Sequence, residues 1–393
     1  MRIQVLVSND VYPPTFGLPL RVFSIARALA RTAAVRVTCA VGSRDRAAAS
    51  QQVDGVDIRR VRTYHPTVFY YLQQARLVSD YMTAEVYRVF PGPLARAWDA
   101  QADVWQIESL NLTTLFERAP EGALRVYSSQ NVEAEWFERV GPPLAGRRRW
   151  ARRIEELERR AVEAADVVLA VSDEDRATFV ERYGAEPDKV WVVDNGFDDV
   201  RLHPPSREER QAARHAIGLD GEPAYVFVGS DMPHNRIAVE HLFRHLVPHL
   251  ERLDARLFLV GGVSDAFASR VEREGRGRVR GLGVVPDVAP ILWASDVGLN
   301  PITVGAGSNG KLPTYLGAGL PAVTTRFGLR GFARLAPFVT VAEPEELAAV
   351  LGRGVAPVAG ASAALEGYTW SSIGARLGER YRERREGRAA CAS

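Results

Sequence analysis

The sequence predicts an α/β protein with two doubly wound parallel-sheet domains of the Rossmann-like kind. The chain has 393 residues, of which 46% are hydrophobic and 25% charged, so it can bury two cores. Short, continuously apolar runs alternate with longer stretches of helical periodicity, and this series occurs twice. Apolar runs of this kind are typical of strands buried on both faces, and their alternation with helices favours parallel sheets.

The predicted elements follow from these runs. The predicted strands of the first half cover 3–8, 35–40, 56–61, 104–108, 124–129, 167–172 and 190–195. Those of the second half cover 224–229, 256–262, 279–282, 297–301 and 321–325, and the clearest helices cover 18–30, 147–164, 173–183 and 237–250. The first run is too short for a signal peptide and no run suits a membrane span, so we expect a soluble, cytoplasmic protein.

A domain boundary is expected near 196–214. Turn residues at 194–196 end a strand, and two prolines at 204–205 interrupt regular structure. The predicted domains are 1–200 and 201–366, followed by an Arg- and Glu-rich helix in 367–393. Ligands of open α/β sheets bind beyond the carboxyl ends of the strands, and two such domains can face each other across a cleft. This arrangement favours an enzyme with two substrates.

Composition excludes several classes of protein. The net charge is +2, too small for a nucleic-acid-binding role. Only Lys189 and Lys311 are lysines, which leaves 48 of the 50 basic residues as arginine. With many alanines, this indicates a high-GC, actinobacterial-like genome. Cys39 and Cys391 are too few for a disulfide framework or a cysteine-based zinc site.

The segment 300–321 is the most informative one. A strand end runs into a glycine-rich loop that precedes a helix, and backbone N–H groups there suit a diphosphate. Gly307 and Gly310 of this loop permit close approach of a ligand to the backbone, and Lys311 would add a positive charge at the phosphates. The alternative is a turn that needs its glycines for backbone conformation and leaves Lys311 solvated.

A second phosphate-binding candidate follows the strand 224–229. Gly229 and Ser230 end this strand, and Arg236 opens the next helix, where a cation opposes the helix dipole. A cation there makes sense opposite an anion. The alternative is a surface arginine.

Two loops of the first domain suit an acceptor. Gly17 and Arg21 follow the first strand, and Gln130, Asn131 and Glu133 follow the strand 124–129. The Gln130 and Asn131 amides can bind a sugar hydroxyl, and the carboxylate of Glu133 or of Glu135 can orient an acceptor. The alternatives are an ordinary strand-to-helix loop and a capped helix with acidic residues in its first turn.

Two further patterns are weighed against simple explanations. The basic run 147–153 can touch a membrane surface or an anionic acceptor, but pairing with Glu155, Glu156 and Glu158 explains it as a solvated helix face. His234, His241, His245 and His249 have no carboxylate to complete a metal site, so we expect surface histidines and no metal.

Together, these motifs resemble the family 4 nucleotide-sugar-dependent glycosyltransferases, which have the GT-B fold. The resemblance covers nearly the whole chain in order and spacing. The matching pieces are 16–21, Gln130-Asn131-Val132-Glu133, 165–172, Asn195-Gly196-Phe197-Asp198, Val228-Gly229-Ser230, Pro233-His234-Asn235, 294–297 and the donor loop 305–315. The final helix resembles the one that returns to the N-terminal domain in this fold.

The resemblance implies a role for each domain. The C-terminal domain would bind a nucleoside-diphosphate sugar, with Gly229, Arg236 and Lys311 at the diphosphate. Further contacts would come from the loop residues Ser308, Asn309 and Gly310. The N-terminal domain would bind the acceptor, with Gly17, Arg21 and Gln130 near the reacting centre. The acceptor would be a small molecule, a lipid-linked molecule or a glycan in natural-product or cell-surface glycan biosynthesis. The reaction would retain anomeric configuration and use cations instead of a metal or another cofactor.

Three positions depart from the family pattern. The paired glutamates of the family fall on Ala306 and Thr314, and the usual histidine is Gln130. Thr314 would bind ribose hydroxyls more weakly than a carboxylate, which fits a UDP- or GDP-sugar held weakly or a dTDP-sugar without a 2′-hydroxyl. Gln130 cannot shuttle protons near neutral pH.

These departures keep other functions open. One is a GT-B enzyme of another reaction type, such as an epimerase or a phosphorylase, although only Lys189 and Lys311 could bind pyridoxal phosphate. Another is a catalytically silent homologue that acts as a binding or partner subunit.

Overall fold

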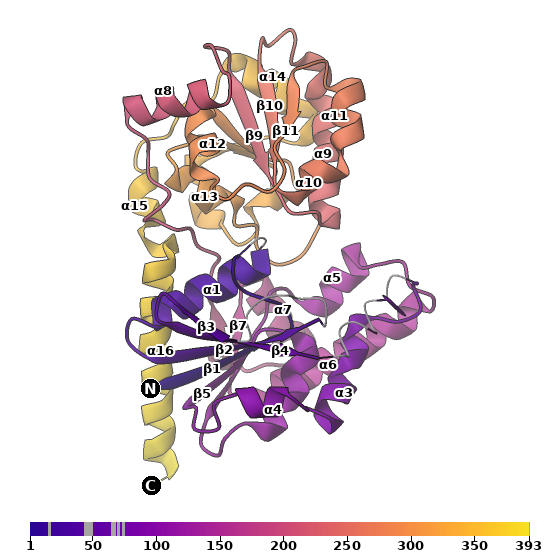
Figure 1. The fold of residues 1–393 in the computed structure, drawn as a ribbon, viewed down its shortest axis with the longest axis vertical. Coiled ribbons are helices and arrows are strands. Elements are labelled where there is room, and N and C mark those ends of the chain that lie inside the picture. The colour runs from indigo at the N-terminus through magenta and orange to yellow at the C-terminus, as the bar shows by residue number, and fades with distance from the viewer. Residues whose placement is uncertain (15–16, 43–49, 64–67, 69–70, 73–74, 393) are drawn as a thin grey trace. The chain divides into compact units, whose positions relative to one another are not determined.

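The chain folds into two compact units. The computed structural model describes residues 1–14, 17–42, 50–63, 68, 71–72 and 75–392 (Figure 1). Unit 1 consists of Met1–Asp194 together with Trp370–Ser393, and unit 2 of Asn195–Thr369. The chain therefore leaves unit 1 directly after β8 and comes back to it at the start of the last helix.

Unit 1 is built on a sheet of eight described strands in the order β3-β4-β2-β1-β5-β6-β7-β8. All neighbours pair in parallel except the edge strand β3, which is antiparallel to β4. The strands are β1 (Arg2–Val7), β2 (Ala34–Val41), β3 (Ser50–Val53), β4 (Val56–Arg62), β5 (Val104–Ile107), β6 (Leu124–Ser128), β7 (Val167–Ala170) and β8 (Val190–Val192). The predicted parallel sheet is confirmed, whereas β3 was not predicted.

Helices cover both faces of this sheet. They are α1 (Gly17–Leu29), α3 (Thr83–Val89), α4 (Leu94–Ala97), α5 (Glu133–Val140), α6 (Arg147–Ala164), α7 (Asp173–Tyr183) and α16 (Trp370–Ala392), with short 3₁₀ turns η1 (Asp80–Met82), η2 (Leu110–Arg118) and η3 (Pro187–Lys189). Alternate strand residues enter the two apolar layers, so Val104 packs in the layer of α1 and α16 and Trp105 in the opposite layer. A Cβ on Gly374 would collide with Ala28, so this glycine allows α16 to pack closely against α1.

Unit 2 has a parallel sheet in the order β11-β10-β9-β12-β13-β14. Its strands are β9 (Ala224–Val228), β10 (Arg256–Val260), β11 (Val279–Gly281), β12 (Val297–Asn300), β13 (Ala322–Thr324) and β14 (Thr340–Val341). Its helices are α8 (Arg207–Ala216), α9 (Pro233–His245), α10 (Gly262–Ala266), α11 (Ala268–Glu274), α12 (Ala289–Ala294), α13 (Lys311–Gly317), α14 (Leu347–Arg353) and α15 (Ala361–Leu365). Short 3₁₀ turns are η4 (Val247–His249), η5 (Phe327–Leu329), η6 (Ala333–Phe338), η7 (Pro344–Glu346) and η8 (Glu366–Tyr368).

The two ends of unit 2 lie next to each other. Phe197 and Thr369 form an isolated parallel bridge, and the Phe197 amide donates to the Tyr368 carbonyl at 3.0 Å. Gly317 lies against the Phe197 ring, where a Cβ would come within 2.5 Å of ring atoms. This ring therefore fixes the start of the unit against α13.

Across the described part of the chain, no helix combines the length and apolar character that crossing a membrane requires.

Candidate functional site

The glycine-rich loop of unit 2 joins β12 to α13 and is fixed by side chains from outside it. The Asn195 amide Nδ2 donates to Ser308 Oγ at 2.9 Å. Arg330 Nε donates to the Gly307 carbonyl at 3.1 Å, where Gly307 has a φ of +70° that favours glycine. The loop is therefore held in one shape by contacts within unit 2.

Lys311, the first residue of α13, lies at the end of a chain of asparagines. Asn309 Nδ2 donates to Asn300 Oδ1 at 2.7 Å. The Lys311 ammonium donates to Asn235 Oδ1 at 2.9 Å and Asn309 Oδ1 at 3.3 Å, and it lies 5.2 Å from the centre of the Phe227 ring. Lys311 is therefore half-buried and held by side chains of unit 2, which does not fit the alternative of a solvated lysine.

The Lys311 ammonium has no carboxylate partner among the described residues. Burial lowers the pKa of Lys311 to about 7. Burial and the Lys311 charge together lower the pKa of His234 to about 4. His234 was expected on the surface but is half-buried, because it packs between the surroundings of Lys311 and Gly305. At neutral pH it carries no charge that would repel a cation.

Close packing explains why residue 229 is a glycine. A Cβ there would lie 2.9 Å from Asn235 Cγ and from the Phe227 ring, so glycine allows the approach of Asn235. Asn235 is buried, and its Nδ2 donates to the Ser230 carbonyl at 3.0 Å while its Oδ1 receives Lys311. Gly229 and Ser230 thus fix the asparagine that holds the lysine.

Arg236 lies in the first turn of α9, which begins at Pro233, earlier than predicted. Its guanidinium donates to Asp231 from Nε at 2.5 Å and from an η nitrogen at 2.8 Å. Both side chains are about half exposed, so this pair is open to exchange with another anion. Its role at a diphosphate remains a prediction.

Thr314 lies one turn into α13. Its hydroxyl donates to the Gly310 carbonyl at 2.8 Å, which leaves the oxygen lone pairs as acceptors. The side chain is half-buried. The geometry is compatible with the predicted acceptance of a sugar hydroxyl.

A buried carboxylate that was not predicted organises the candidate acceptor site of unit 1. Glu108 follows β5 and is 2% exposed, and burial raises its pKa. Gln130 Nε2 donates to Glu108 Oε2 at 2.8 Å, and Gln106 Nε2 donates to Oε1. Gln106 in turn accepts from the Tyr381 hydroxyl of α16 at 2.8 Å. The orientation of Gln130 is therefore set by Glu108. An acid at the carboxyl end of a buried strand was the signal for it.

Arg21 and Gly17 both belong to α1. Arg21 is buried and donates to the carbonyls of Val193 at 2.7 Å and Asp194 at 2.9 Å, and burial lowers its pKa. It therefore holds the end of β8, a structural role that was not predicted; the predicted acceptor contact remains a prediction. Gly17 is exposed, and a Cβ there would meet no described atom within 4 Å. Residues 15–16 of the same predicted motif lie outside the described residues.

Glu133 and Asn131 lie at the start of α5. Glu133 Oε2 accepts from the Tyr81 hydroxyl at 2.6 Å, and the Asn131 carbonyl accepts from Ser129 Oγ. The backbone amide of Glu133 donates to Glu158 at 2.8 Å. Glu158 therefore does not pair with the basic run as expected; it caps α5.

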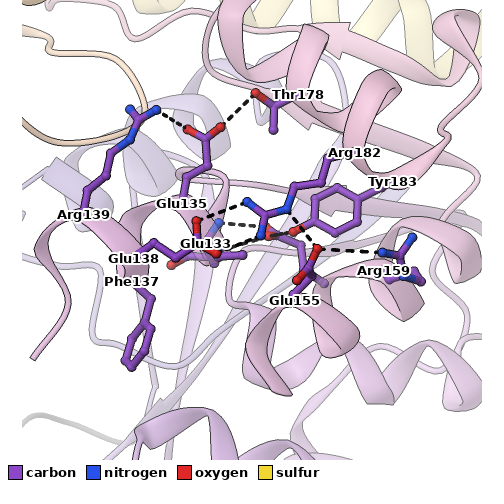
Figure 2. A network of polar contacts seen from close by, with 12 residues as sticks. Glu133, Glu135, Phe137, Glu138, Arg139, Glu155, Arg159, Thr178, Arg182 and Tyr183 are labelled. Carbon is purple, nitrogen blue, oxygen red and sulfur yellow. Dashed lines mark hydrogen bonds and ion pairs between the residues drawn. The ribbon is translucent and has the colours of Figure 1, made fainter. Parts of the chain in front are cut away.

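A polar network holds α5, α6 and α7 together (Figure 2). Arg182 of α7 binds Glu138 of α5 at 2.9 Å and Glu155 of α6 at 3.0 Å. Thr178 donates to Glu135 at 3.2 Å. Three helices around the loop 129–133 are thus fixed by ion pairs, which gives the candidate acceptor residues a firm support.

Within unit 2 the structure brings together Gly229, Ser230, Ser308, Asn309, Gly310 and Lys311, with Arg236 and Thr314 on the adjoining helices. Within unit 1 it links Gln130 to Glu108 and places Gly17, Arg21, Asn131 and Glu133 after β1 and β6. In the part of the chain that the structure describes, no three His, Cys, Asp or Glu side chains meet as metal ligands would.

Models of known protein families match segments in both units of the chain. Residues 129–201 match the model described as Glycosyltransferase Family 4, and residues 222–354 match the model described as Glycosyl transferases group 1. The chain belongs to the family 4 glycosyltransferases. The two matches cover the candidate acceptor segment of unit 1 and the lysine loop of unit 2, which confirms the resemblance seen in the sequence.

Curated relatives of this family 4 chain match part of its length. It is 36% identical over 113 residues to the α-maltose-1-phosphate synthase of Mycolicibacterium smegmatis, covering 28% of each protein. It is 35% identical over 117 residues to the D-inositol 3-phosphate glycosyltransferase of Nocardia farcinica, covering 29% of this chain and 25% of the relative. The chain thus matches about a quarter of the length of these relatives.

Solved structures resemble the family 4 chain over its whole length. The sucrose-phosphate synthase of Thermosynechococcus elongatus matches with a TM-score of 0.73 at 15% identity and covers 100% of both chains. Anabaena HepE in complex with UDP and glucose matches with a TM-score of 0.58 at 14% identity, covering 99% of this chain and 98% of its own. These likenesses show the GT-B fold.

Proposed function

We propose that this family 4 glycosyltransferase moves a sugar from a nucleoside-diphosphate sugar, bound by unit 2, to a hydroxyl group or other nucleophile of an acceptor bound by unit 1. The observation that carries this proposal is the Lys311 ammonium, held by two asparagine oxygens with no carboxylate partner among the described residues. A cation left in this state favours an anionic ligand.

The chemistry follows from the charge that develops on the leaving group. When the bond between the sugar and the diphosphate breaks, negative charge grows on the departing phosphate oxygen. The Lys311 ammonium and, once released from Asp231, the Arg236 guanidinium would offset this charge. We propose that the reaction needs no metal and retains the configuration at the anomeric carbon, which NMR of the product would test.

The named relatives narrow the substrates. HepE was solved with UDP and with UDP-glucose, which supports a nucleoside-diphosphate sugar as donor. The names of the maltose-1-phosphate synthase and the D-inositol 3-phosphate glycosyltransferase contain phosphorylated sugars or cyclitols. Phosphorylated small acceptors are therefore the first to test, before lipid-linked acceptors and growing glycans.

The donor base is proposed from Thr314. This side chain offers a hydroxyl, already donating to Gly310, where a carboxylate would bind both ribose hydroxyls more strongly. A dTDP-sugar, which lacks the 2′-hydroxyl, loses less from this change than a UDP- or GDP-sugar. Calorimetry with UDP, GDP and dTDP decides the point, and tighter binding of UDP or GDP would rule out the dTDP preference.

The acceptor side is proposed from Gln130. Its amide is oriented by Glu108 and can hold an acceptor hydroxyl without exchanging a proton. Gly17 adds an exposed helix start, around which no described atom would come within 4 Å of a Cβ. Gly17→Ala should therefore raise the KM for the acceptor and leave donor affinity unchanged.

The decisive experiment is a panel of nucleoside-diphosphate sugars with phosphorylated and unphosphorylated acceptors, read by mass spectrometry. We expect transfer to an acceptor, and slow release of free sugar when the acceptor is omitted. Lys311→Met should lower both by about 10²–10³, and Lys189→Met, the matched control at the other lysine, should not. Nucleotide binding without turnover over the whole panel would instead indicate a catalytically silent homologue.

A further inference from the structure

A second concentration of positive charge lies in unit 1, against β2 and β4. A cavity of about 340 Å³ is lined by Arg36 of β2, by Ser50 of β3, by Arg59, Arg60 and Val61 of β4, and by Arg96 and Ala97 of α4. Small-molecule sites have volumes of about 300–1,000 Å³, so this cavity can hold more than a single ion.

The strand register brings the charges onto one face. In the parallel pair of β2 and β4, Arg36 lies opposite Asp57, and Thr38 lies opposite Arg59. Because side chains alternate along a strand, Arg36, Asp57 and Arg59 project from the same side of the sheet. The cavity is therefore built on two paired strands, which hold its charges at fixed spacing.

One carboxylate orients two of the arginines. Asp57 Oδ2 accepts from Arg36 Nε at 2.8 Å, and Asp57 Oδ1 accepts from Arg59 Nε at 2.8 Å. Each of these two guanidiniums uses only its Nε in the contact with Asp57. Within the described residues, its η nitrogens bind no other group. The exposed Arg96 likewise has no ion-pair partner among those residues. Three guanidiniums and one carboxylate leave two positive charges.

We propose that this cavity binds the phosphate group of a phosphorylated small molecule. Guanidinium forks match phosphate oxygens in pairs, and their orientation by Asp57 lowers the cost of arranging them. Two net positive charges match a dianionic phosphate monoester, whereas a carboxylate would leave one charge uncompensated. The Ser50 hydroxyl adds one donor, and the rest of the cavity accommodates the body of the ligand.

The site is connected to the loop after β1 through the next residue of β4. Arg60 follows Arg59 and also lines the cavity, but its charge is paired: its Nε donates to Asp10 at 2.7 Å, and an η nitrogen donates to the Tyr12 carbonyl at 2.7 Å. A ligand that fixes Arg59 therefore acts on the strand that anchors this loop, which leads into α1.

Isothermal titration of the full chain with inorganic phosphate, glucose 6-phosphate and glucose tests the proposal. All proteins carry Lys311→Met, so that the lysine loop does not contribute a phosphate site. We expect phosphate and glucose 6-phosphate to compete for one site, with the sugar phosphate tighter and glucose not bound. Arg36→Ala with Arg59→Ala should abolish binding, whereas Arg31→Ala, at an exposed arginine in the turn after α1, should not change it.

If the double variant does not fold, Arg96→Ala still tests the proposal. Arg96 is exposed and has no ion pair among the described residues, so its replacement should not disturb the fold. We expect it to weaken glucose 6-phosphate binding about tenfold, the usual effect of losing one charged hydrogen bond. The proposal is overturned if the parent protein binds neither phosphate nor glucose 6-phosphate. It is equally overturned if Arg96→Ala and the double variant bind as the parent does, or if glucose binds as tightly as its phosphate.

Discussion

Unit 1 and unit 2 treat a buried charge in opposite ways. In unit 1, Glu158 is fully buried, and its two oxygens accept four hydrogen bonds: from the Tyr127 and Tyr183 hydroxyls and from the amides of Glu133 and Ala134. Burial nevertheless raises its pKa to about 7. Every acceptor position is in use, so this carboxylate has no capacity left for a ligand.

In unit 2, the pKa of Lys311 is also about 7. Burial disfavours the charged form of this group too, and for a lysine this lowers the pKa. Among the described residues, the Lys311 ammonium has the neutral oxygens of Asn235 and Asn309 as acceptors and no carboxylate. The comparison teaches that a buried charge with a complete set of partners stabilises the fold, whereas one with incomplete partners retains free energy for binding a ligand.

The largest expected effect separates these two roles at Lys311. Lys311→Met should lower kcat/KM for the donor by about 10²–10³, as removal of one charge-stabilising group does in other enzymes. The same change should raise the free energy of unfolding by about 1–2 kcal/mol, because a buried ammonium is replaced by an apolar side chain of similar length. Donor kinetics and denaturant unfolding measure the two effects. Unchanged kinetics with lower stability would make Lys311 a structural residue.

The converse is expected at Glu158. Glu158→Ala should lower the free energy of unfolding by about 3 kcal/mol, because four donors lose their acceptor in a buried site. Denaturant unfolding measures this, with Glu156→Ala on the exposed face of α6 as the control. Donor affinity should stay unchanged, and a loss of affinity in a fully folded variant would contradict the structural role.

The third prediction concerns pH. Lys311 has a pKa of about 7 in the free protein, and a bound diphosphate raises it, so binding takes up a proton above pH 7. Affinity for UDP-glucose should be flat below pH 6 and then fall by up to about tenfold per pH unit above pH 7, since one proton is linked to binding. His234, with a pKa of about 4, stays neutral throughout this range.

Calorimetry from pH 6 to 9 measures this slope. Lys311→Arg is the matched variant, because arginine stays charged over the whole range and should give an affinity that does not change with pH. UDP-glucose is the better probe than UDP, since its phosphates have no titrating proton near neutrality. An equal slope in the wild type and the arginine variant would refute the assignment to Lys311.

The smallest expected effect tests the exposed pair beside the lysine. Asp231→Asn frees Arg236 for the diphosphate and should raise donor affinity by no more than about threefold, because exposed ion pairs contribute little. Asp254→Asn, which breaks an exposed pair with Arg278 in the same unit, is the control and should change nothing. Weaker donor binding in Asp231→Asn would show that Asp231 itself helps to hold the ligand.

Much of the fold could be predicted because its strands are strongly apolar. The runs that form β1, β5 and β9 are buried along nearly their whole length, so their composition identifies them. The edge strands β3 and β14 were missed, because one is polar and the other has only two residues. Short edge strands depend on pairing with a neighbour and leave little local pattern.

A candidate site could be proposed from the sequence where backbone and charge combine in one segment, and it stays a prediction. Lys311 stands in a glycine-rich loop, and its position alone suggested a phosphate. Glu108 was missed because its surroundings include Gln130, which binds it, and Tyr381, which binds the neighbouring Gln106, and both come from distant parts of the chain. The pairing of Arg236 with Asp231 was likewise invisible, since it depends on side-chain direction at the start of α9.

The neighbouring ends of unit 2 have a consequence for how such a chain can change. Because Phe197 and Thr369 are bridged, the whole of Asn195–Thr369 enters and leaves at one point. Recombination at two junctions, which are far apart in the gene but neighbours in the folded chain, can exchange such a segment without interrupting either sheet. Under the proposed function, such an exchange would replace the donor site in a single event and leave the proposed acceptor site of unit 1 unchanged.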